Sequence, residues 1–419
     1  MAYRKTHAPK IWHSVKVEYM FILTIASMLL SSTITHGPML GDLTDTSVKI
    51  WVQTSEPAEL RFGIAGTDLF FEAESSQDTN STAIVQFEGL EPNKTYSYDI
   101  NGEANDAWTF TTRPKKDNTA RIAFGSCANE KEGSSKVWNR MDESNIDALV
   151  LLGDTPYIDT TDLAIQRTRY QEFSAVPAFA KLVSRTPLYA TWDDHDFGRN
   201  DTDGNLAGKE NSRQAFSEYR PNPSVGENNQ GIYTKFSIGP VEVFLLDARW
   251  FARTEVSDNK IPTLLGKQQW AWLEASLKQS TAPFKILACG MIFNGATRIG
   301  KTDHWGDYPT EYFRLLSIIK RNNIEGVTLV SGDIHWSRVI EHDTESKIGY
   351  DLVEFITSPI HERLIEAANA KHSGDLFSVG EINSFLLLEA IASDEQTTLT
   401  MTITNADGQK LFSKTMLKD

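Results

Sequence analysis

Four apolar runs in this chain each end abruptly on side chains that bind metal ions. Short apolar runs bounded by Gly are typical of buried strands. The four segments are IAFGSC (122–127), ALVLLGDTPY (148–157), LYATWDDHD (188–196) and VTLVSGDIH (327–335). In an open α/β sheet, ligands bind beyond the carboxyl ends of the strands. We therefore expect the four clusters to meet at one edge, where their Asp, His, Tyr and Cys side chains would form a metal site.

The residue types in these clusters indicate which metals they would hold. A carboxylate such as Asp154 can bridge two cations, and two cations can clamp a phosphoryl group. Asp333 and His335 are two residues apart in an extended segment, so their side chains point to the same side. Tyr157 is close enough to Asp154 to supply a phenolate. A phenolate together with the thiolate of Cys127 favours a trivalent, thiophilic metal over magnesium.

The third cluster carries the densest negative charge. Asp193, Asp194 and Asp196 surround His195 and would repel one another without a cation. Carboxylates of this kind suit a hard cation such as calcium. A single Gly-Asp pair more often caps a turn or helix, so the inference depends on the whole set. Of the other histidines, His304 lies in a loop from which it can reach the site, and His342, His361 and His372 are assigned to the surface or to structural roles.

A fifth apolar run ends on arginine rather than on metal ligands. Phe244-Leu-Leu precedes Asp247, Arg249 and Arg253. The planar guanidinium of arginine suits phosphate, so Arg249 is a candidate for binding an anionic substrate. A structural pairing of Arg249 with Asp247 or another nearby acid explains the spacing equally well.

The chain divides into regions that differ in their expected secondary structure. With 419 residues it is long enough for two domains. Short alternating segments predict a small all-β sandwich: 48–52, 59–64, 83–87, 95–100 and 107–112. After a polar linker at 113–119, apolar strands alternate with helix-like stretches, which indicates an α/β fold. The expected helices are 136–144, 162–174, 207–220, 266–279 and 309–322, and the final strands are 383–391, 396–404 and 410–416.

The N-terminus and the net charge constrain where the protein acts and on what. Residues 21–30 (FILTIASMLL) form an apolar run preceded by basic residues, which is typical of a signal peptide, with an uncleaved anchor as the alternative. We therefore expect an exported protein with no stable membrane span after cleavage. The net charge of -15 offers no attraction to nucleic acid, so no nucleic-acid partner is expected. In an exported protein Cys127 and Cys289 could form a disulfide, but Cys127 ends a strand where a ligand would sit.

The ordered motifs resemble those of the PhoD-type alkaline phosphatases, within the wider metallophosphatase superfamily. The resemblance covers Phe124–Cys127, Gly153–Tyr157, Trp192–Phe197, Leu246–Arg249 and Ser331–His335, and segment 36–45 resembles that family's leading β-sandwich. Segment 89–98 also resembles a fibronectin type III strand. The resemblance implies a four-layer α/β/β/α sandwich preceded by a small all-β sandwich domain. The implied regions are a signal peptide or anchor (1–35), a fibronectin type III or immunoglobulin-like β-sandwich (36–113) and a catalytic domain (120–419).

The resemblance also implies a ligand set. Ferric iron, Fe(3+), would be held by the residues equivalent to Cys127, Asp154, Tyr157 and His335. Calcium, Ca(2+), would lie near Asp154, Asp333 and the third cluster. There Asp194 aligns with a metal-binding Asn of the superfamily, and Asn200 is a rival ligand. The chain departs from its relatives at Thr155-Pro156 and just after Phe197.

The resemblance implies hydrolysis of phosphate esters, and we expect small monoesters to be hydrolysed by a metal-activated water or hydroxide. The cations and Arg249 would meet the charge that develops on the phosphoryl oxygens. His195 would protonate the leaving alkoxide. The alternatives are a phosphodiesterase or phospholipase D-like hydrolase of the same fold and, in another class, a catalytically inactive exported binding or adhesion protein.

Overall fold

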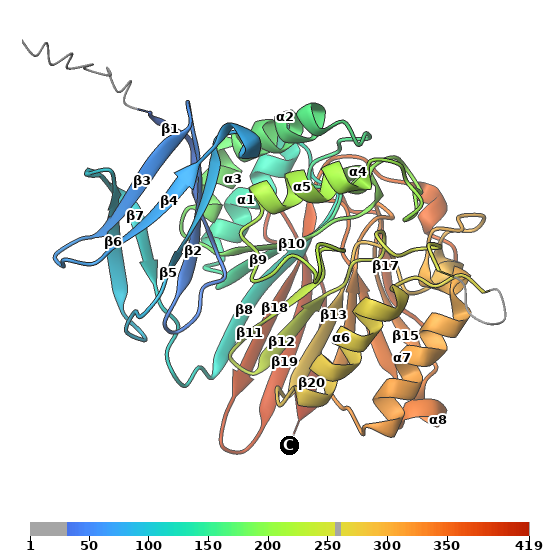
Figure 1. Cartoon of the computed structure of the whole chain (residues 1–419). Helices are drawn as coiled ribbons and strands as arrows, with labels where there is room; N and C mark the ends of the chain where they lie inside the picture. Colours follow the sequence, from blue (N-terminus) through green and yellow to red (C-terminus); the bar gives the residue numbers. More distant parts are fainter. Residues whose placement is uncertain (1–31, 256–260, 419) are drawn as a thin grey trace, which may run out of the picture.

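The structure is a computed structural model, and it describes residues 32–255 and 261–418. Within them, seven strands form a β-sandwich at the N-terminal end, and the following residues form an α/β unit with two large sheets. Figure 1 shows the sandwich, in blue, standing beside the α/β unit. The apolar run at 21–30, expected to be a signal peptide or anchor, lies outside the described residues. Among the described helices, none is long and apolar enough to cross a bilayer.

The β-sandwich consists of two antiparallel sheets whose inner faces share one apolar core. The first sheet contains β1 (Ile34–Gly41), β2 (Val48–Thr54) and β5 (Thr82–Phe87). The second contains β4 (Phe70–Ser75), β3 (Ala58–Ile64), β6 (Thr95–Ile100) and β7 (Glu103–Thr111). The five alternating segments of the sequence correspond to β2, β3, β5, β6 and β7, which confirms the predicted all-β region.

The α/β unit is built around a six-stranded and a seven-stranded sheet. In spatial order, the first contains β10 (Leu188–Thr191), β9 (Ala148–Leu152), β8 (Thr119–Gly125), β18 (Ser384–Ala392), β19 (Thr397–Asn405) and β20 (Lys410–Lys418). The second contains β11 (Thr234–Ile238), β12 (Val241–Leu245), β13 (Phe284–Ala288), β14 (Val327–Ser331), β16 (Leu352–Ile356), β15 (Ser337–His342) and β17 (Asp375–Val379). The strands that precede the four motifs expected to bind metal are parallel to their chain neighbours within each sheet.

Helices cover the outer face of each large sheet. One group packs on the six-stranded sheet: α1 (Glu132–Glu143), α2 (Leu163–Ser174), α3 (Pro177–Val183) and α5 (Lys209–Tyr219). On the seven-stranded sheet lie α6 (Gly266–Gln279) and α7 (Pro309–Arg321), and the short helices are α4 (Asp194–Phe197) and α8 (Glu345–Ile348). The result is the four-layer α/β/β/α arrangement that Figure 1 displays.

Alternation within the buried strands explains why the sheets stack. Ile122 and Phe124 of β8 point into the core between the sheets, whereas Ala123 points toward the helices. In β9, Val150 and Leu152 face the same inter-sheet core. Because successive side chains of a strand point to opposite faces, a continuous apolar run is buried on both faces. The sheets therefore bring their strand ends together at one edge of the molecule.

The β-sandwich is joined to the α/β unit by a shared core and by hydrogen bonds. Trp51 of β2 belongs to the apolar cluster beneath α1, α3 and α5, and its indole N–H donates to the carbonyl of Glu218 at 2.7 Å. The hydroxyl of Tyr219 accepts from Asn80 Nδ2 at 2.8 Å and from Gln53 Nε2 at 3.2 Å. The sandwich is therefore packed against the end of α5.

Candidate metal centre

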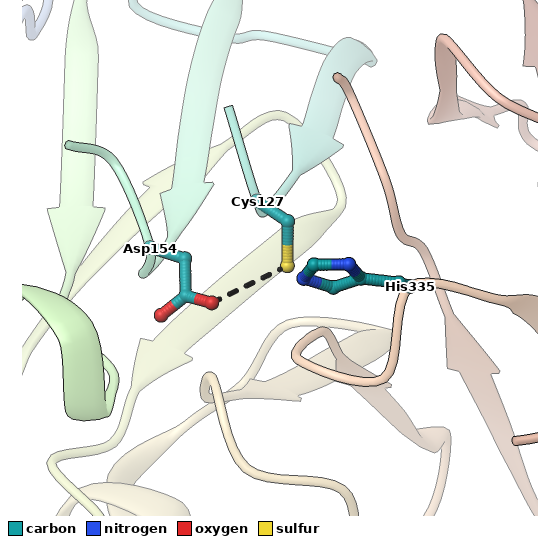
Figure 2. Close-up of side chains that lie close together, drawn as sticks. All are labelled: Cys127, Asp154 and His335. Atoms are coloured by element: carbon teal, nitrogen blue, oxygen red, sulfur yellow. Dashed lines mark hydrogen bonds between the residues drawn. The ribbon is translucent and has the colours of Figure 1, made fainter. Parts of the chain in front are cut away.

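Three strand ends, drawn from both large sheets, bring Cys127, Asp154 and His335 together. Cys127 follows β8 and Asp154 follows β9 in the six-stranded sheet, whereas His335 follows β14 in the seven-stranded sheet. One ligand atom from each lies within 4.8 Å of the others, and all three residues are buried. Figure 2 shows the thiol of Cys127 between the carboxylate and the imidazole, with Cys127 Sγ 3.5 Å from Asp154 Oδ2.

The backbone at this point has an unusual conformation. Cys127, Asp154, Asp333 and His335 have φ angles of 56°, 53°, 65° and 52°, in the left-handed region that non-glycine residues seldom adopt. Gly153, which precedes Asp154, has a φ of 94°, and a Cβ there would lie 2.3 Å from the backbone nitrogen of Asp193. The chain therefore turns sharply after each strand and aims these side chains at one point.

Tyr157 lies beside His335 in the first group, and so does a histidine that the sequence did not place there. The Tyr157 hydroxyl lies 3.0 Å from His335 Nε2 and 3.1 Å from His361 Nε2. His361 is 3% exposed and follows β16 in a loop. The sequence pattern assigned His361 to the surface or to a structural role, and its place beside Tyr157 corrects that assignment.

A second group of ligands adjoins the first and shares Asp154 with it. Asp154 lies with Asp194 and His195 in one cluster, and Asp193, Asp194 and Asp333 form another. The burial of Asp194 is complete, whereas the rival ligand Asn200 is exposed. Its neighbour Asp201 donates its backbone N–H to Asp194 Oδ2 at 2.7 Å.

Asp196, also in the third motif, accepts hydrogen bonds from the backbone instead. Its carboxylate accepts the N–H groups of Asp154, Thr155 and Asp193 at 2.6–2.9 Å. These bonds fix the loops after β9 and β10 to each other. Asp196 therefore holds the ligand-bearing loops in register.

His195 lies at the exposed side of the cluster. Its Nδ1 is 2.5 Å from Asp159 Oδ1, and its ring centroid is 4.7 Å from that of Tyr157. The His195 side chain is 21% exposed, more than the buried Asp154 and Asp194 beside it. A histidine oriented by a carboxylate and open to solvent can exchange a proton with a bound molecule.

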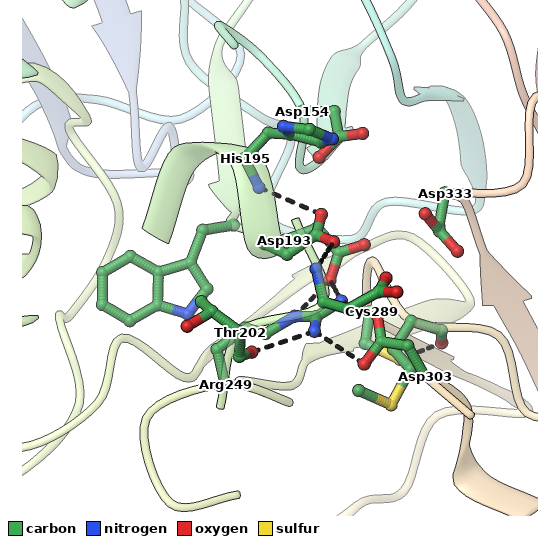
Figure 3. A network of polar contacts seen from close by, with 12 residues as sticks. Asp154, Asp193, His195, Thr202, Arg249, Cys289, Asp303 and Asp333 are labelled. Atoms are coloured by element: carbon green, nitrogen blue, oxygen red, sulfur yellow. Dashed lines mark hydrogen bonds and ion pairs between the residues drawn. The ribbon is translucent and has the colours of Figure 1, made fainter. Parts of the chain in front are cut away.

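Arg249 is placed differently from the phosphate-binding role expected of it. Its side chain is fully buried; Nε donates to Asp193 Oδ1 at 2.6 Å, and Nη1 and Nη2 donate to Asp303 at 2.8 and 2.7 Å. Figure 3 shows this network beside Asp154 and Asp333. The structural alternative, pairing with a nearby acid, therefore describes Arg249. The partners of its guanidinium do not include Asp247, which accepts the Arg249 backbone N–H instead.

A lysine that sequence reasoning missed lies at the acidic group. Lys301 Nζ is 2.9 Å from Asp333 Oδ2 and 3.1 Å from Asp201 Oδ1, and the Lys301 side chain is 6% exposed. Lys301 belongs to the loop before α7 that also carries Asp303. His304, the neighbour expected to reach the site, instead lies against Gly295 and 4.0 Å from Asp307. No sequence motif marks Lys301.

Burial of several acids together raises their pKa values. Desolvation, followed by the charges of Asp194 and Asp193, raises the pKa of Asp154 well above its usual range. Desolvation, opposed by the charge of Lys301, raises the pKa of Asp333 to about 6. Burial also raises the pKa values of Cys127 and Tyr157. For Asp194, burial is outweighed by Arg249, His195 and Lys301, which hold its pKa at about 2.

These residues fit a metal ion. Asp154 Oδ1 and Asp193 Oδ2 are buried oxygens that accept no hydrogen bond within the described residues, and His335 Nδ1 likewise has no partner there. Buried polar atoms without partners are costly, and a cation would satisfy them. Both cysteines are free, so the disulfide alternative for Cys127 is not formed in the structure. Thiol, phenol, imidazole and carboxylate together form a donor set for a transition metal beside a site for a hard cation.

Comparison with known proteins gives consistent matches. The model of the PhoD-like phosphatase family matches residues 122–405, and a domain family of unknown function matches residues 31–120. Alkaline phosphatase D of Bacillus subtilis is 26% identical over 324 residues, which cover 63% of this chain but only 56% of that protein. A solved structure of PhoD superposes with a TM-score of 0.71 at 18% identity, covering 90% of this chain and 91% of that one. The latter likeness shows a shared fold.

Proposed function

Because the chain belongs to the PhoD-like phosphatase family, we propose that it is an exported, metal-dependent phosphoesterase that hydrolyses small phosphate monoesters. The observation that carries this proposal is the meeting of two groups of candidate ligands at Asp154. Paired cations at such a site can hold a phosphoryl group between them. Export is supported by the apolar run at 21–30 with its preceding basic residues.

We assign the ligands by their chemistry. Cys127, Tyr157 and His335, with Asp154, would hold ferric iron, since thiolate and phenolate prefer a trivalent metal. Asp154, Asp194 and Asp333 would hold calcium, and the buried position of Asp194 favours it over the exposed Asn200. When bound, the cations neutralise phosphate charge and lower the pKa of a water molecule at the site.

His195 is the group we propose as the acid for the leaving alkoxide. Asp159 engages Nδ1, which orients the ring and leaves Nε2 as the nitrogen for proton transfer. The partly exposed position of His195 allows a substrate to approach it. Protonation of the leaving oxygen avoids the release of a strongly basic alkoxide.

Lys301, rather than Arg249, is the cation we propose to meet the phosphoryl oxygens. Arg249 is fully buried and its guanidinium is occupied by Asp193 and Asp303. Lys301 Nζ ends beside Asp333, one of the carboxylates that would hold calcium. When cations neutralise the carboxylates, its ammonium is free to pair with a substrate oxygen. Arg249 then positions Asp193.

One experiment separates the proposed activity from its alternatives. The purified protein is assayed with p-nitrophenyl phosphate and with bis-p-nitrophenyl phosphate, while iron and calcium are measured in the same sample. Preference for the monoester, with both metals bound, is the expected result. Preference for the diester would replace the monoesterase with a phosphodiesterase. Metal binding without turnover of either ester would indicate a binding protein.

A further inference from the structure

His361 is held rigidly against the strand that carries Cys127. Its loop follows β16, and the backbone N–H groups of Ile360 and His361 donate to the carbonyls of Ser126 and Cys127, both at 3.0 Å. The His361 carbonyl accepts from the backbone N–H of Asn383 at 3.3 Å. With the residue buried, these bonds leave its ring little freedom.

The contacts of the ring define which nitrogen carries the proton. His361 Nδ1 accepts the backbone N–H of Arg363 at 3.0 Å. A ring nitrogen that accepts a hydrogen bond carries no hydrogen, so in a neutral imidazole the proton lies on the other nitrogen. That nitrogen, Nε2, is 3.1 Å from the hydroxyl oxygen of Tyr157. His361 is therefore the donor and the Tyr157 oxygen the acceptor.

A second imidazole also lies within hydrogen-bonding distance of the Tyr157 oxygen. His335 Nε2 lies 3.0 Å away, and the centroids of the two histidine rings are 4.6 Å apart. The bond from His361 occupies one lone pair of the Tyr157 oxygen and fixes the position of that oxygen beside His335. A phenolate is the form that can bind a metal ion.

From this geometry we propose that His361 is a positioning residue that donates its Nε2–H to the Tyr157 oxygen and so holds that oxygen in place as a ligand of the trivalent metal. This inference rests on the proposed function, in which Tyr157 is a ligand. Hydrogen bonds to ligand atoms orient them and adjust their donor strength, and losing one costs about 10- to 100-fold in metal affinity.

The tautomer is tested without any metal. Nitrogen-15 NMR of the metal-free full chain, with long-range coupling from the ring protons, distinguishes a protonated Nε2 from a protonated Nδ1. The proposal requires protonation at Nε2 of His361, and a proton at Nδ1 would overturn it. His342 provides an internal reference, because it is a second buried histidine with its own partners, Tyr312 and Glu354.

The effect on the metal is tested with two variants of the full-length protein loaded with ferric iron. His361→Leu removes the donor, whereas His361→Gln can place an amide N–H near the same point. For His361→Leu we expect the phenolate-to-iron absorption to shift to longer wavelength and iron affinity to fall by about 10- to 100-fold. His361→Gln should recover most of both. Unchanged phenolate vibrations in resonance Raman spectra, with unchanged iron affinity in His361→Leu, would overturn the proposal.

Tyr157→Phe identifies the phenolate signal and links it to His361. The variant should lose the phenolate vibrations, and adding His361→Leu should then cause no further loss of iron, because coupled residues are not additive. A further loss would show that His361 acts elsewhere. If the wild-type protein itself showed no phenolate signal with ferric iron, the proposed metal site would fail while the tautomer measurement still decided the hydrogen bond. If His361→Leu does not fold, His361→Gln and the wild-type tautomer decide the matter.

Discussion

At the scale of single residues, the site combines backbone strain with buried charge. Four ligand-motif residues, Cys127, Asp154, Asp333 and His335, have left-handed backbone angles. Such a conformation costs about 1–2 kcal/mol for an ordinary L-residue, and less for Asp. Strain of this kind persists where the surrounding fold fixes it, and it occurs at functional sites. Here it directs side chains from two sheets toward one point.

The sequence motifs predicted which residue types form the site, but they did not predict several residues that contact the candidate ligands. Asp154 and His335 stand directly after apolar runs, so a strand-end argument finds them. Lys301, Asp303 and His361 lie in loops without periodicity, and their position depends on how those loops pack. No local pattern encodes such contacts. The one sequence signal for His361 is its place after another strand, β16.

Substitution of His195 and of Asp154 should separate an acid from a ligand. His195→Ala should lower the rate by about 10²–10⁴-fold, with a greater loss for alkyl phosphates than for p-nitrophenyl phosphate, while metal content stays near that of the wild type. Asp154→Asn removes the carboxylate shared by both ligand groups and should lose metals and activity together. Rates on two leaving groups and metal analysis check both. Loss of metals in His195→Ala would instead make His195 a ligand.

Arg249 should matter for stability more than its neighbour Arg253 does. Arg249→Met leaves Asp193 buried without its partner, and breaking a buried ion pair in this way costs about 3–5 kcal/mol. Arg253 is 39% exposed and lies 3.3 Å from Asp307, so Arg253→Met should cost about 0–1 kcal/mol. Urea unfolding of the two variants measures the difference. Equal losses would show that the Asp193 pair is not a main support of the fold.

At the scale of elements, the sequence predicted those helices and strands in which apolar residues recur with a clear period. The expected helix 266–279 coincides with α6, and the final strands match β18, β19 and β20 within a few residues. α3 (Pro177–Val183) was missed because seven residues are too few for a clear period, and β4 (Phe70–Ser75) because it is largely exposed. The periodicity of the sequence also does not predict how the strands divide between two sheets, because a strand buried on both faces is a continuous apolar run in either sheet. That feature came only from family resemblance.

Helix α5 connects the β-sandwich with the loop that carries Asp154. Tyr219, its last residue, accepts hydrogen bonds from the sandwich, and Arg220 follows it directly. The Arg220 guanidinium donates to the carbonyl of Thr155, beside Asp154, at 2.7 Å and lies over the ring of Tyr170. The two units thus support the same short stretch of chain.

Removing the side chain of Trp51, through which the sandwich contacts the α/β unit, should therefore destabilise the α/β unit. Trp51→Ala should lower the unfolding free energy by about 3–5 kcal/mol, since it empties a fully buried site between the two units. Trp108 lies within the sandwich and stacks on Tyr98, so Trp108→Ala is the matched control. Thermal unfolding followed by metal release should shift for Trp51→Ala more than for Trp108→Ala. An unchanged release temperature in Trp51→Ala would show that the units unfold independently.

At the scale of the whole molecule, metal ions should contribute to stability as well as to hydrolysis. The buried carboxylates around Asp154 repel one another, and burial raises the pKa values of Asp154 and Asp193. Exhaustive chelation should abolish hydrolysis and lower Tm, and calcium with iron should restore both. At free metal about 1,000 times Kd, binding adds about 4 kcal/mol. Calorimetry and assay of the same samples check this, and full activity in demetallated protein would refute the proposed mechanism.

The position of β8 in its sheet has a consequence for how the chain is made. β8, whose end carries Cys127, lies between β9, which follows it within a few dozen residues, and β18, which belongs to the last part of the chain. During synthesis on the ribosome, one edge of β8 stays open until residues 384–392 have emerged. An open strand edge invites pairing with other chains. The nascent chain is therefore open to such pairing until β18 is available, and a chain that stalls before β18 cannot complete this sheet.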